Sequence, residues 1–363
     1  MAKLQVRHAS IMEIAAYVPG KSSVGGKNPP IKLSSNENPF GASPLAFEAM
    51  KKAIEKTNRY PDAYCKELRS AIAKKYGMDA ENIVCGAGSD ELLSLLCQAY
   101  ARDGDEVLYS EYGFLMYPIS ALRVGATPVV AQEKNYKTDI DAILNAVTDK
   151  TTIVFLANPN NPTGSYITKQ EMRRLRAGLR DDILLVIDAA YAEYVDESDY
   201  SSGMGMVEEF DNVVMTRTFS KIYGLSSLRI GWAYCPSYIA DVLNRIRGPF
   251  NVSDIAQRAA LASIADDEFV EKSKSHNKKW LKIVTDEIND LGLRAFPSVG
   301  NFVLVEFSEE SGRAAEDAYE FLKTKSIIGR YMESYNLPNC IRFSIGLEKE
   351  NKSMLAALKE FLG

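Results

Sequence analysis

Histidine and cysteine are scarce in this sequence. Its 363 residues include only two histidines, His8 and His276, far apart in the chain. We therefore expect neither a histidine-rich metal site nor a Ser/His/Asp hydrolase, and no metal is predicted. The sequence has five cysteines, an odd number, and no CxxC motif. That usage favours reduced thiols in a cytosolic protein over a disulfide framework.

Long runs of apolar or basic residues are also missing. The first twenty residues contain no apolar stretch long enough for a signal peptide, and no 18-residue apolar span follows. The formal net charge is −5 and no long basic run occurs, so a general nucleic-acid role is not expected. The net charge does not exclude a site for anionic small molecules, because such a site needs only a local cluster of arginines. We expect a cytoplasmic protein without nucleic-acid or membrane partners.

What is present is typical of a globular α/β protein: 46% of residues are hydrophobic and 25% are charged. Helical patterns cover 43–56, 65–77 and 89–101. Runs of strand length, rich in β-branched residues, then alternate with helical stretches. These runs are 106–110, 127–131, 151–157, 183–190, 212–218 and 230–235. The alternation predicts βα units around a mostly parallel sheet.

The pattern changes after about residue 250. Two long helical stretches, 253–266 and 267–292, precede strand-like segments at 301–307 and 340–346, with a helix from 314 to 325 between them. This order indicates a smaller α+β domain. We predict three parts: an N-terminal arm (1–35), a large domain (36–250) and a small C-terminal domain (251–363).

Polar residues close several of the strand-like runs, where ligands bind in doubly wound sheets. Asp188 ends one run and Tyr191 follows it, Asn161 lies in "NPNNPTG", and Ser89 begins a helix after a Gly-rich loop. Lys221 follows another run and precedes Arg229 by eight positions. Each feature alone has an ordinary explanation: a helix cap, a rigid loop, a turn or a surface lysine. Together they form one coherent set.

That set suits catalysis with pyridoxal 5'-phosphate. Lys221 would form a Schiff base with the cofactor aldehyde and act as the proton shuttle. Asp188 would keep the pyridine nitrogen protonated, and Tyr191 and Asn161 would hydrogen-bond the ring hydroxyl. Arg229, Ser220 and the start of the helix at Ser89 would bind the phosphate. These are the candidate catalytic and cofactor-binding residues: Lys221, Asp188 and Tyr191 for catalysis, and Asn161, Ser220, Arg229 and Ser89 for binding.

With these residues in place, the sequence resembles the fold-type I aminotransferases and, within them, the histidinol-phosphate aminotransferase family. The likeness spans nearly the whole chain. The matching stretches are "LSSNENPFG" (33–41), "NRYPD" (58–62), "GAGSDEL" (86–92), "NPNNPTG" (158–164), "DAAYAEY" (188–194), "RTFSKIYGLSSLRIGW" (217–232), "RGPFNVS" (247–253) and "IRFSIG" (341–346). The resemblance implies a large domain with a mostly parallel seven-stranded sheet between helices, and a homodimer with shared active sites. The usual "DEAY" is "DAAY" here, with Ala189 in place of a glutamate, and the aspartate and tyrosine are kept.

The resemblance also implies further site residues. Asp90 and Thr218 would join the phosphate site, and Tyr60 would reach that phosphate from the other subunit. Phe114 would stack on the cofactor ring; Tyr112 is an alternative, because the proline of the family's "PTF" or "PTY" motif is missing. Asn36 and Asn161 would contact the substrate, and Tyr17, on the arm, would lie over the partner's substrate pocket.

Two arginines bear on the substrate. In aminotransferases that it resembles, an arginine near the C-terminus grips the substrate carboxylate, and Arg342 fits that role. Arg330, twelve residues earlier, would complete the pair that histidinol-phosphate enzymes use for a phosphate. The expected reaction is amino transfer from histidinol phosphate to 2-oxoglutarate. An aromatic amino-acid or dual-specificity aminotransferase, a pyridoxal-phosphate lyase acting on threonine phosphate, and a non-catalytic regulator module are the alternatives.

Overall fold

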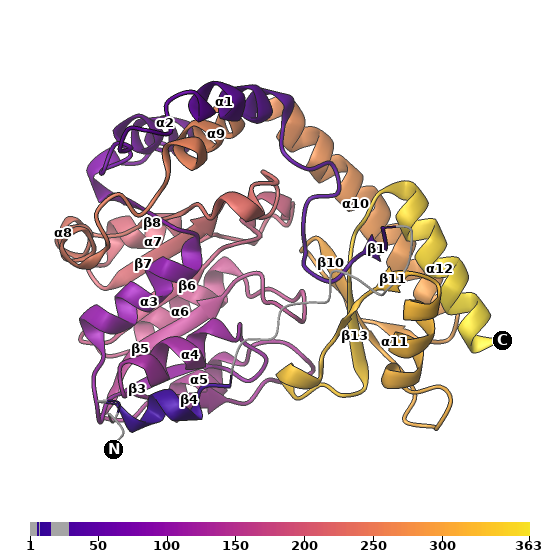
Figure 1. Cartoon of the computed structure of the whole chain (residues 1–363). Coiled ribbons are helices and arrows are strands. Elements are labelled where there is room, and N and C mark those ends of the chain that lie inside the picture. The colour runs from indigo at the N-terminus through magenta and orange to yellow at the C-terminus, as the bar shows by residue number, and fades with distance from the viewer. Residues whose placement is uncertain (1–5, 7, 16–28) are drawn as a thin grey trace, which may run out of the picture.

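The computed structural model describes residues 6, 8–15 and 29–363, which form two regions, each built on its own sheet (Figure 1). The larger region contains a seven-stranded sheet with the strand order β2-β8-β7-β6-β5-β3-β4. The strands are β2 (Ile83–Gly86), β8 (Gly231–Tyr234), β7 (Val213–Thr218), β6 (Leu184–Asp188), β5 (Thr151–Ala157), β3 (Glu106–Ser110) and β4 (Thr127–Ala131). β8 runs antiparallel to both neighbours and the other neighbouring pairs are parallel. The predicted mostly parallel seven-stranded sheet is confirmed.

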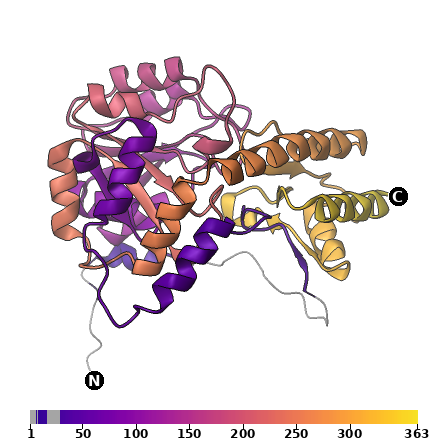
Figure 2. The ribbon, with the colours of Figure 1, turned by 90° about the horizontal axis from the view of Figure 1, so that it is seen from above.

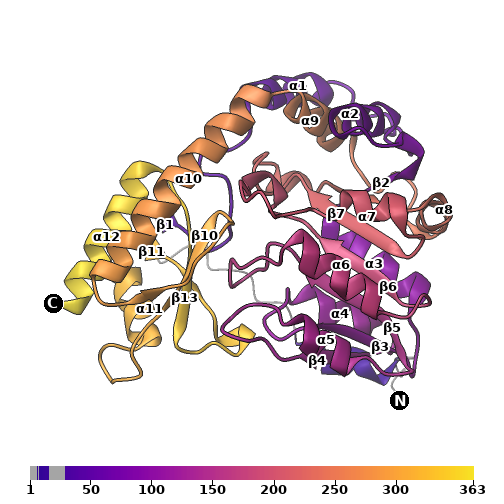
Figure 3. The ribbon, with the colours of Figure 1, turned by 180° about the vertical axis from the view of Figure 1, so that it is seen from behind.

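Helices cover both faces of this sheet because successive strand side chains point to opposite sides. In β5, Ile153 and Phe155 pack in one apolar cluster, whereas Val154 and Leu156 pack in the other. The first cluster includes α3 (Ser89–Tyr100), α4 (Met116–Arg123) and α8 (Ser237–Ile246). The second includes α5 (Ile140–Ala146), α6 (Lys169–Gly178) and α7 (Met204–Glu209), which lie in front of the sheet in Figure 3.

Three further helices pack together beside the edge of the sheet formed by β2 and β8: α1 (Pro44–Ile54), α2 (Lys66–Tyr76) and α9 (Asp254–Ile264). Their ends follow the sequence signals. The Ser43 hydroxyl accepts a hydrogen bond from the backbone N–H of Ala46, and Pro44 takes the first helical position. Gly77 ends α2 in the left-handed conformation, with φ +70°.

The smaller region contains an antiparallel sheet of order β12-β13-β10-β9. Its strands are β12 (Arg330–Tyr331), β13 (Cys340–Ser344), β10 (Phe302–Glu306) and β9 (Arg294–Ala295), and its helices are α10 (Asp267–Asp290), α11 (Ala315–Thr324) and α12 (Glu348–Leu362). In β13, Ile341 and Phe343 pack against these helices, so Arg342 points to the opposite face, toward the larger region. β1 (Ile31–Lys32) pairs in parallel with β11 (Ile327–Ile328).

Short 3-10 helices complete the described elements: η1 (Ala9–Glu13), η2 (Ala80–Asn82), η3 (Ala192–Tyr194), η4 (Ser226–Leu228) and η5 (Glu333–Tyr335). Among the residues the structure covers, no helix has both the length and the apolar character needed to cross a membrane.

The domain limits remain a prediction, and the packing suggests where to adjust them. Ala256 and Ala260 of α9 pack in the core of the larger region, whereas Trp280 and Val284 of α10 pack in the core of the smaller one. Leu33 also packs in the smaller core. We propose that the two domains meet within α10, which runs from one region to the other (Figures 1 and 2).

Candidate active site

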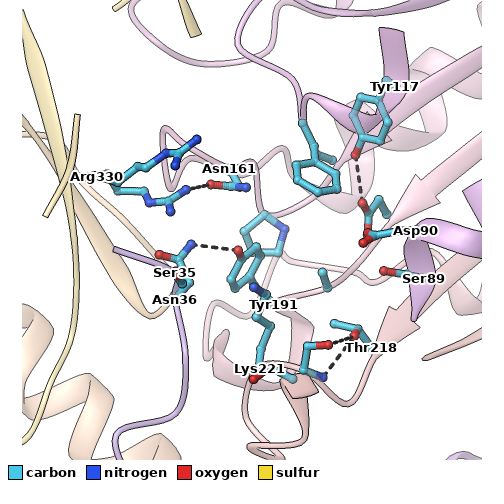
Figure 4. Close-up of a pocket in the computed structure, with 18 of the residues that line it drawn as sticks. Ser35, Asn36, Ser89, Asp90, Tyr117, Asn161, Tyr191, Thr218, Lys221 and Arg330 are labelled. Carbon is cyan, nitrogen blue, oxygen red and sulfur yellow. Dashed lines mark hydrogen bonds between the residues drawn. The ribbon is translucent and has the colours of Figure 1, made fainter. Parts of the chain in front are cut away.

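A cavity of about 220 Å³ lies between the two regions. The carboxyl ends of β5, β6 and β7 and the start of α3 form its floor, and β12 and β13 face them. In Figure 4, Arg330 and Asn161 lie on the side opposite Ser89 and Asp90, with Tyr191 and Lys221 between. The lining residues predicted from the sequence are Asn36, Ser89, Asp90, Phe114, Asn161, Asp188, Tyr191, Thr218, Ser220, Lys221, Arg229, Arg330 and Arg342.

Asp188, the last residue of β6, presents a buried carboxylate to this cavity. Its Oδ2 accepts a hydrogen bond of 3.0 Å from the Tyr117 hydroxyl, and its Oδ1 accepts one of 3.4 Å from Thr216 Oγ1. Burial raises the pKa of Asp188 to about 6, the Tyr117 hydrogen bond works in the opposite direction, and the nearby charge of Asp90 raises it further. Both hydrogen-bond donors are neutral, so this carboxylate suits a cationic group such as a protonated ring nitrogen.

Lys221 and Tyr191 lie beside one another on the same floor. Lys221 follows β7, and its Nζ lies 5.5 Å from the centre of the Tyr191 ring. The Tyr191 hydroxyl accepts a hydrogen bond of 2.9 Å from Asn36 Nδ2. Asn36 is itself held by Ser344, whose hydroxyl accepts a hydrogen bond from the Asn36 backbone N–H (2.7 Å) and donates one to Asn36 Oδ1 (3.1 Å). The phenol is thereby oriented from the smaller region.

An anion cradle forms where α3 begins. Arg229 Nη1 donates to Ser220 Oγ at 3.3 Å, and its Nη2 forms an ion pair of 3.1 Å with Asp90. Gly88, which precedes the helix, has φ +83°, and a Cβ there would lie 2.2 Å from Arg229 Nη2. The positive φ therefore favours glycine here, and its missing side chain leaves room for the Arg229 guanidinium. A helix start of this kind, with an arginine beside it, fits the phosphate of the predicted cofactor.

Two arginines face the cradle from the smaller sheet. Arg330 of β12 and Arg342 of β13 are paired directly across the antiparallel register. Arg342 Nη1 donates to Asn161 Oδ1 of the larger region, and its Nη2 donates to the backbone oxygen of Ser34 at 3.0 Å. Its guanidinium carbon lies 5.3 Å from the centre of the Phe302 ring. The paired cations are suited to an anionic group on the substrate.

Two predicted residues are not placed in the cavity. Tyr60 lies outside the lining set, is 83% exposed and stacks on Phe250 with ring centres 4.6 Å apart. Tyr17 lies outside the described residues. Of the two candidates for the stacked aromatic, Phe114 lines the cavity, whereas Tyr112 stacks on Tyr136 at 5.5 Å. This placement favours Phe114.

The sequence reasoning missed several lining residues. Tyr117, on α4, supplies the hydrogen bond to Asp188, and no local pattern links these two positions. Ser34 and Ser35 lie inside the matched "LSSNENPFG" stretch, so their place in a motif was the available signal. Tyr335 lies between the two arginines in sequence. Within the described ranges, no group of three or more His, Cys, Asp or Glu side chains could hold a metal ion.

Comparisons with known proteins agree with this geometry. The family described as aminotransferase class I and II matches residues 28–358. Histidinol-phosphate aminotransferase from Paramagnetospirillum magneticum is 54% identical over 353 residues, 97% of each chain, and that from Maricaulis maris is 50% identical over 98% of each. The crystal structure of histidinol-phosphate aminotransferase from Sinorhizobium meliloti, in complex with pyridoxal-5'-phosphate, is similar with a TM-score of 0.89. It is 26% identical, covering 99% of this chain and 98% of that one.

Proposed function

The chain belongs to the class I and II aminotransferases, and we propose that it transfers the amino group of histidinol phosphate to 2-oxoglutarate, using pyridoxal 5'-phosphate. The products are imidazole acetol phosphate and glutamate, in histidine biosynthesis. The observation that carries this substrate is the Arg330–Arg342 pair, which faces the anion cradle across the cavity. Such a pair can hold the phosphate of the amine. Arg342 alone can hold the carboxylate of glutamate, which supports one site for both substrates.

When bound, the cofactor supplies an aldehyde for covalent attachment of the amine and a ring that accepts electrons from the reacting carbon. In our proposal Lys221 Nζ is the base that removes the proton from the amine-bearing carbon, and the acid that returns a proton. Asp188 holds a proton on the ring nitrogen, and Tyr117 and Thr216 keep its carboxylate oriented. These roles rest on the buried position of Asp188 and on the place of Lys221 beside Tyr191.

The remaining lining residues bind and orient. Arg229 and Ser220, with the first N–H groups of α3, bind the cofactor phosphate, and Ser89, Asp90 and Thr218 complete that cradle. Tyr191 and Asn161 would hold the ring hydroxyl, and Phe114 would pack on the ring. On the opposite side, Asn36 and the two arginines face the substrate. We propose these roles because each of these residues lines the same cavity.

Single-turnover reactions test the substrate. Purified enzyme is mixed with histidinol phosphate, phenylalanine or threonine phosphate, without an oxoacid, and the cofactor absorbance is followed. We expect the ratio of rate constant to apparent dissociation constant to be highest for histidinol phosphate. Arg330→Ala should lower that ratio roughly 30-fold, the loss of a charged hydrogen-bond partner, and change the ratio for glutamate far less. Arg313→Ala, an exposed arginine before α11, is the matched control.

Other outcomes select the alternatives. Equal reaction of histidinol phosphate and phenylalanine would mean a dual-specificity enzyme, and reaction of phenylalanine alone an aromatic aminotransferase. Release of carbon dioxide from threonine phosphate, without an oxo product, would mean a lyase. If Arg330→Ala affects glutamate as strongly as histidinol phosphate, Arg330 does not select the phosphate.

We propose that the enzyme is a homodimer in which Tyr60 completes the phosphate site of the partner subunit. Tyr60 is 83% exposed and lies outside its own cavity, which supports a role in another subunit. Large apolar side chains are also exposed nearby, with Phe47 at 53% and Ile54 at 58% on α1. Tyr17 of the arm is proposed to reach the partner's substrate pocket.

Mixing two inactive variants tests the shared site. Tyr60→Ala and Lys221→Ala subunits, unfolded together and refolded, should recover about a quarter of wild-type activity, because half of the dimers carry one complete site of two. Refolding either variant alone should recover none. Tyr64→Ala, which changes an exposed tyrosine of the same segment, should be active by itself. No recovery in the mixture would contradict a site shared through Tyr60.

We also propose a cytoplasmic location, since all five cysteines are free thiols. Free thiols are usual in a reducing compartment.

A further inference from the structure

A tight turn of the larger region, Lys134–Lys137, has an unusual backbone. Lys134 and Lys137 exchange both backbone hydrogen bonds, at 3.0 and 3.1 Å. The two central residues, Asn135 and Tyr136, have φ of +53° and +60°. Glycine is favoured at the second position of such a two-residue turn, and asparagine tolerates the first. Tyrosine therefore occupies a strained position, which its side-chain contacts must hold in place.

Those contacts cross to the smaller region. The centre of the Tyr136 ring lies 4.2 Å from that of Phe296 and 5.5 Å from that of Tyr112, and the guanidinium carbon of Arg294 lies 5.8 Å from it. The Tyr136 hydroxyl donates to Glu306 Oε1, at the end of β10, over 3.1 Å. Arg294 also donates to the Glu306 carboxylate, at 3.1 Å. The tip of the turn thus joins the larger region to the edge of the smaller sheet.

Strand pairing in the smaller sheet links Glu306 to Arg342. Glu306 pairs with Cys340 in the antiparallel register, and Leu304 pairs with Arg342 two residues further along. Strand pairing fixes the distance between these positions. A shift of Glu306 relative to the larger region would therefore also shift Arg342.

Glu133, three residues before Tyr136, contacts Asn160, the neighbour in the chain of a hydrogen-bond partner of Arg342. Asn160 Nδ2 donates to Glu133 Oε1 at 3.1 Å, and the next residue, Asn161, accepts the hydrogen bond from Arg342. Asn160 is 1% exposed. Burial raises the pKa of Glu133 to about 7. At neutral pH this carboxyl is therefore partly protonated, and glutamine, which has nearly the same shape, keeps the oxygen that accepts from Asn160.

We propose that segment 133–136 is a clasp between the two regions, in which Glu133 and Tyr136 are positioning residues for the substrate carboxylate. Tyr136 fixes the strand that carries Arg342, and Glu133 fixes the loop that carries Asn161. Together they set the spacing between these two groups. The clasp rests on the proposed aminotransferase activity, and not on the choice of histidinol phosphate as donor.

Tyr136→Ala tests the clasp in single turnovers of the holoenzyme with glutamate, and of its amine form with 2-oxoglutarate. The apparent dissociation constant should rise about tenfold, within the range of energetic coupling through packed networks. The limiting rate constant should change less than about twofold, because Lys221 and Asp188 belong to other elements. Tyr136→Phe, which keeps the ring contacts but loses the hydrogen bond to Glu306, should restore part of the affinity. Tyr166→Ala is the matched control, because the Tyr166 hydroxyl also donates to a carboxylate, that of Asp199, over 2.9 Å. Tyr166 does not line the cavity.

A second pair of variants tests the other end of the clasp. Glu133→Gln keeps an oxygen that accepts from Asn160 and should bind glutamate as the wild type does, within about twofold. Glu133→Ala should raise the apparent dissociation constant several-fold, with an unchanged limiting rate constant. A general loss of packing would lower both the affinity for glutamate and the limiting rate constant.

The outcomes separate the two proposals. If the wild-type enzyme reacts with glutamate but not with histidinol phosphate, the proposed amino donor is wrong. The clasp is still tested by the same variants, because their binding of glutamate is measured independently of histidinol phosphate. The clasp is wrong if Tyr136→Ala binds glutamate as wild type does, if Tyr166→Ala has an equal effect, or if the limiting rate constant falls as far as the affinity.

Discussion

Lys221→Ala is expected to lower the rate of transamination by about 10⁴-fold or more, because it removes both the covalent attachment point and the proton-transfer group. The purified variant should still retain cofactor, since Arg229, Ser220 and the start of α3 remain in place. The measurement is the single-turnover rate with glutamate, together with the bound cofactor determined from its absorbance.

Lys221→Arg is the conservative variant for this test. It keeps a cation near the Tyr191 ring, where Lys221 Nζ lies 5.5 Å from the ring centre, but an arginine cannot supply a neutral amine. We expect it to be as inactive as Lys221→Ala. Activity in either variant would contradict the assignment of Lys221, and activity in the arginine variant alone would mean that only its charge is needed.

Asp188→Asn is expected to lower the rate by roughly a thousandfold, because an amide cannot hold a proton on the cofactor ring nitrogen. The two side chains have nearly the same shape, so the packing around Tyr117 and Thr216 should be kept. Asp241→Asn, on the exposed face of α8, is the control and should leave the rate unchanged. Near-normal turnover of Asp188→Asn would contradict the proposed role.

The same variant should show a characteristic stability profile without cofactor. Burial raises the pKa of Asp188 from 3.8 to about 6 in the folded protein. Between these values the unfolded chain releases the proton and the folded chain keeps it, so the free energy of unfolding falls as pH rises. Asparagine does not titrate. The stability of Asp188→Asn relative to wild type should therefore rise by about 2 kcal/mol from pH 4 to pH 7. Urea unfolding of the cofactor-free proteins across this range measures it, and a constant difference would contradict the raised pKa.

Local patterns determined the elements and the floor of the site. Asp188 ends an apolar strand, Ser89 begins a helix after a glycine, and Lys221 follows a strand, so each could be placed from its immediate neighbours in the chain. The parallel order of the strands then brings such residues to one edge of the sheet. Hydrophobic periodicity, turn residues and motif spacing are properties of short segments, and they predicted these features correctly.

Only the tertiary structure decided which distant residues touch. Tyr117 reaches Asp188 because α4 packs on one face of the sheet, and Arg330 stands beside Arg342 because of the register of β12 and β13. Tyr136 crosses to Glu306 for the same kind of reason. Such contacts depend on how whole elements pack, with side chains separated by up to hundreds of residues filling a common space. A single sequence specifies that packing without displaying it in any local pattern.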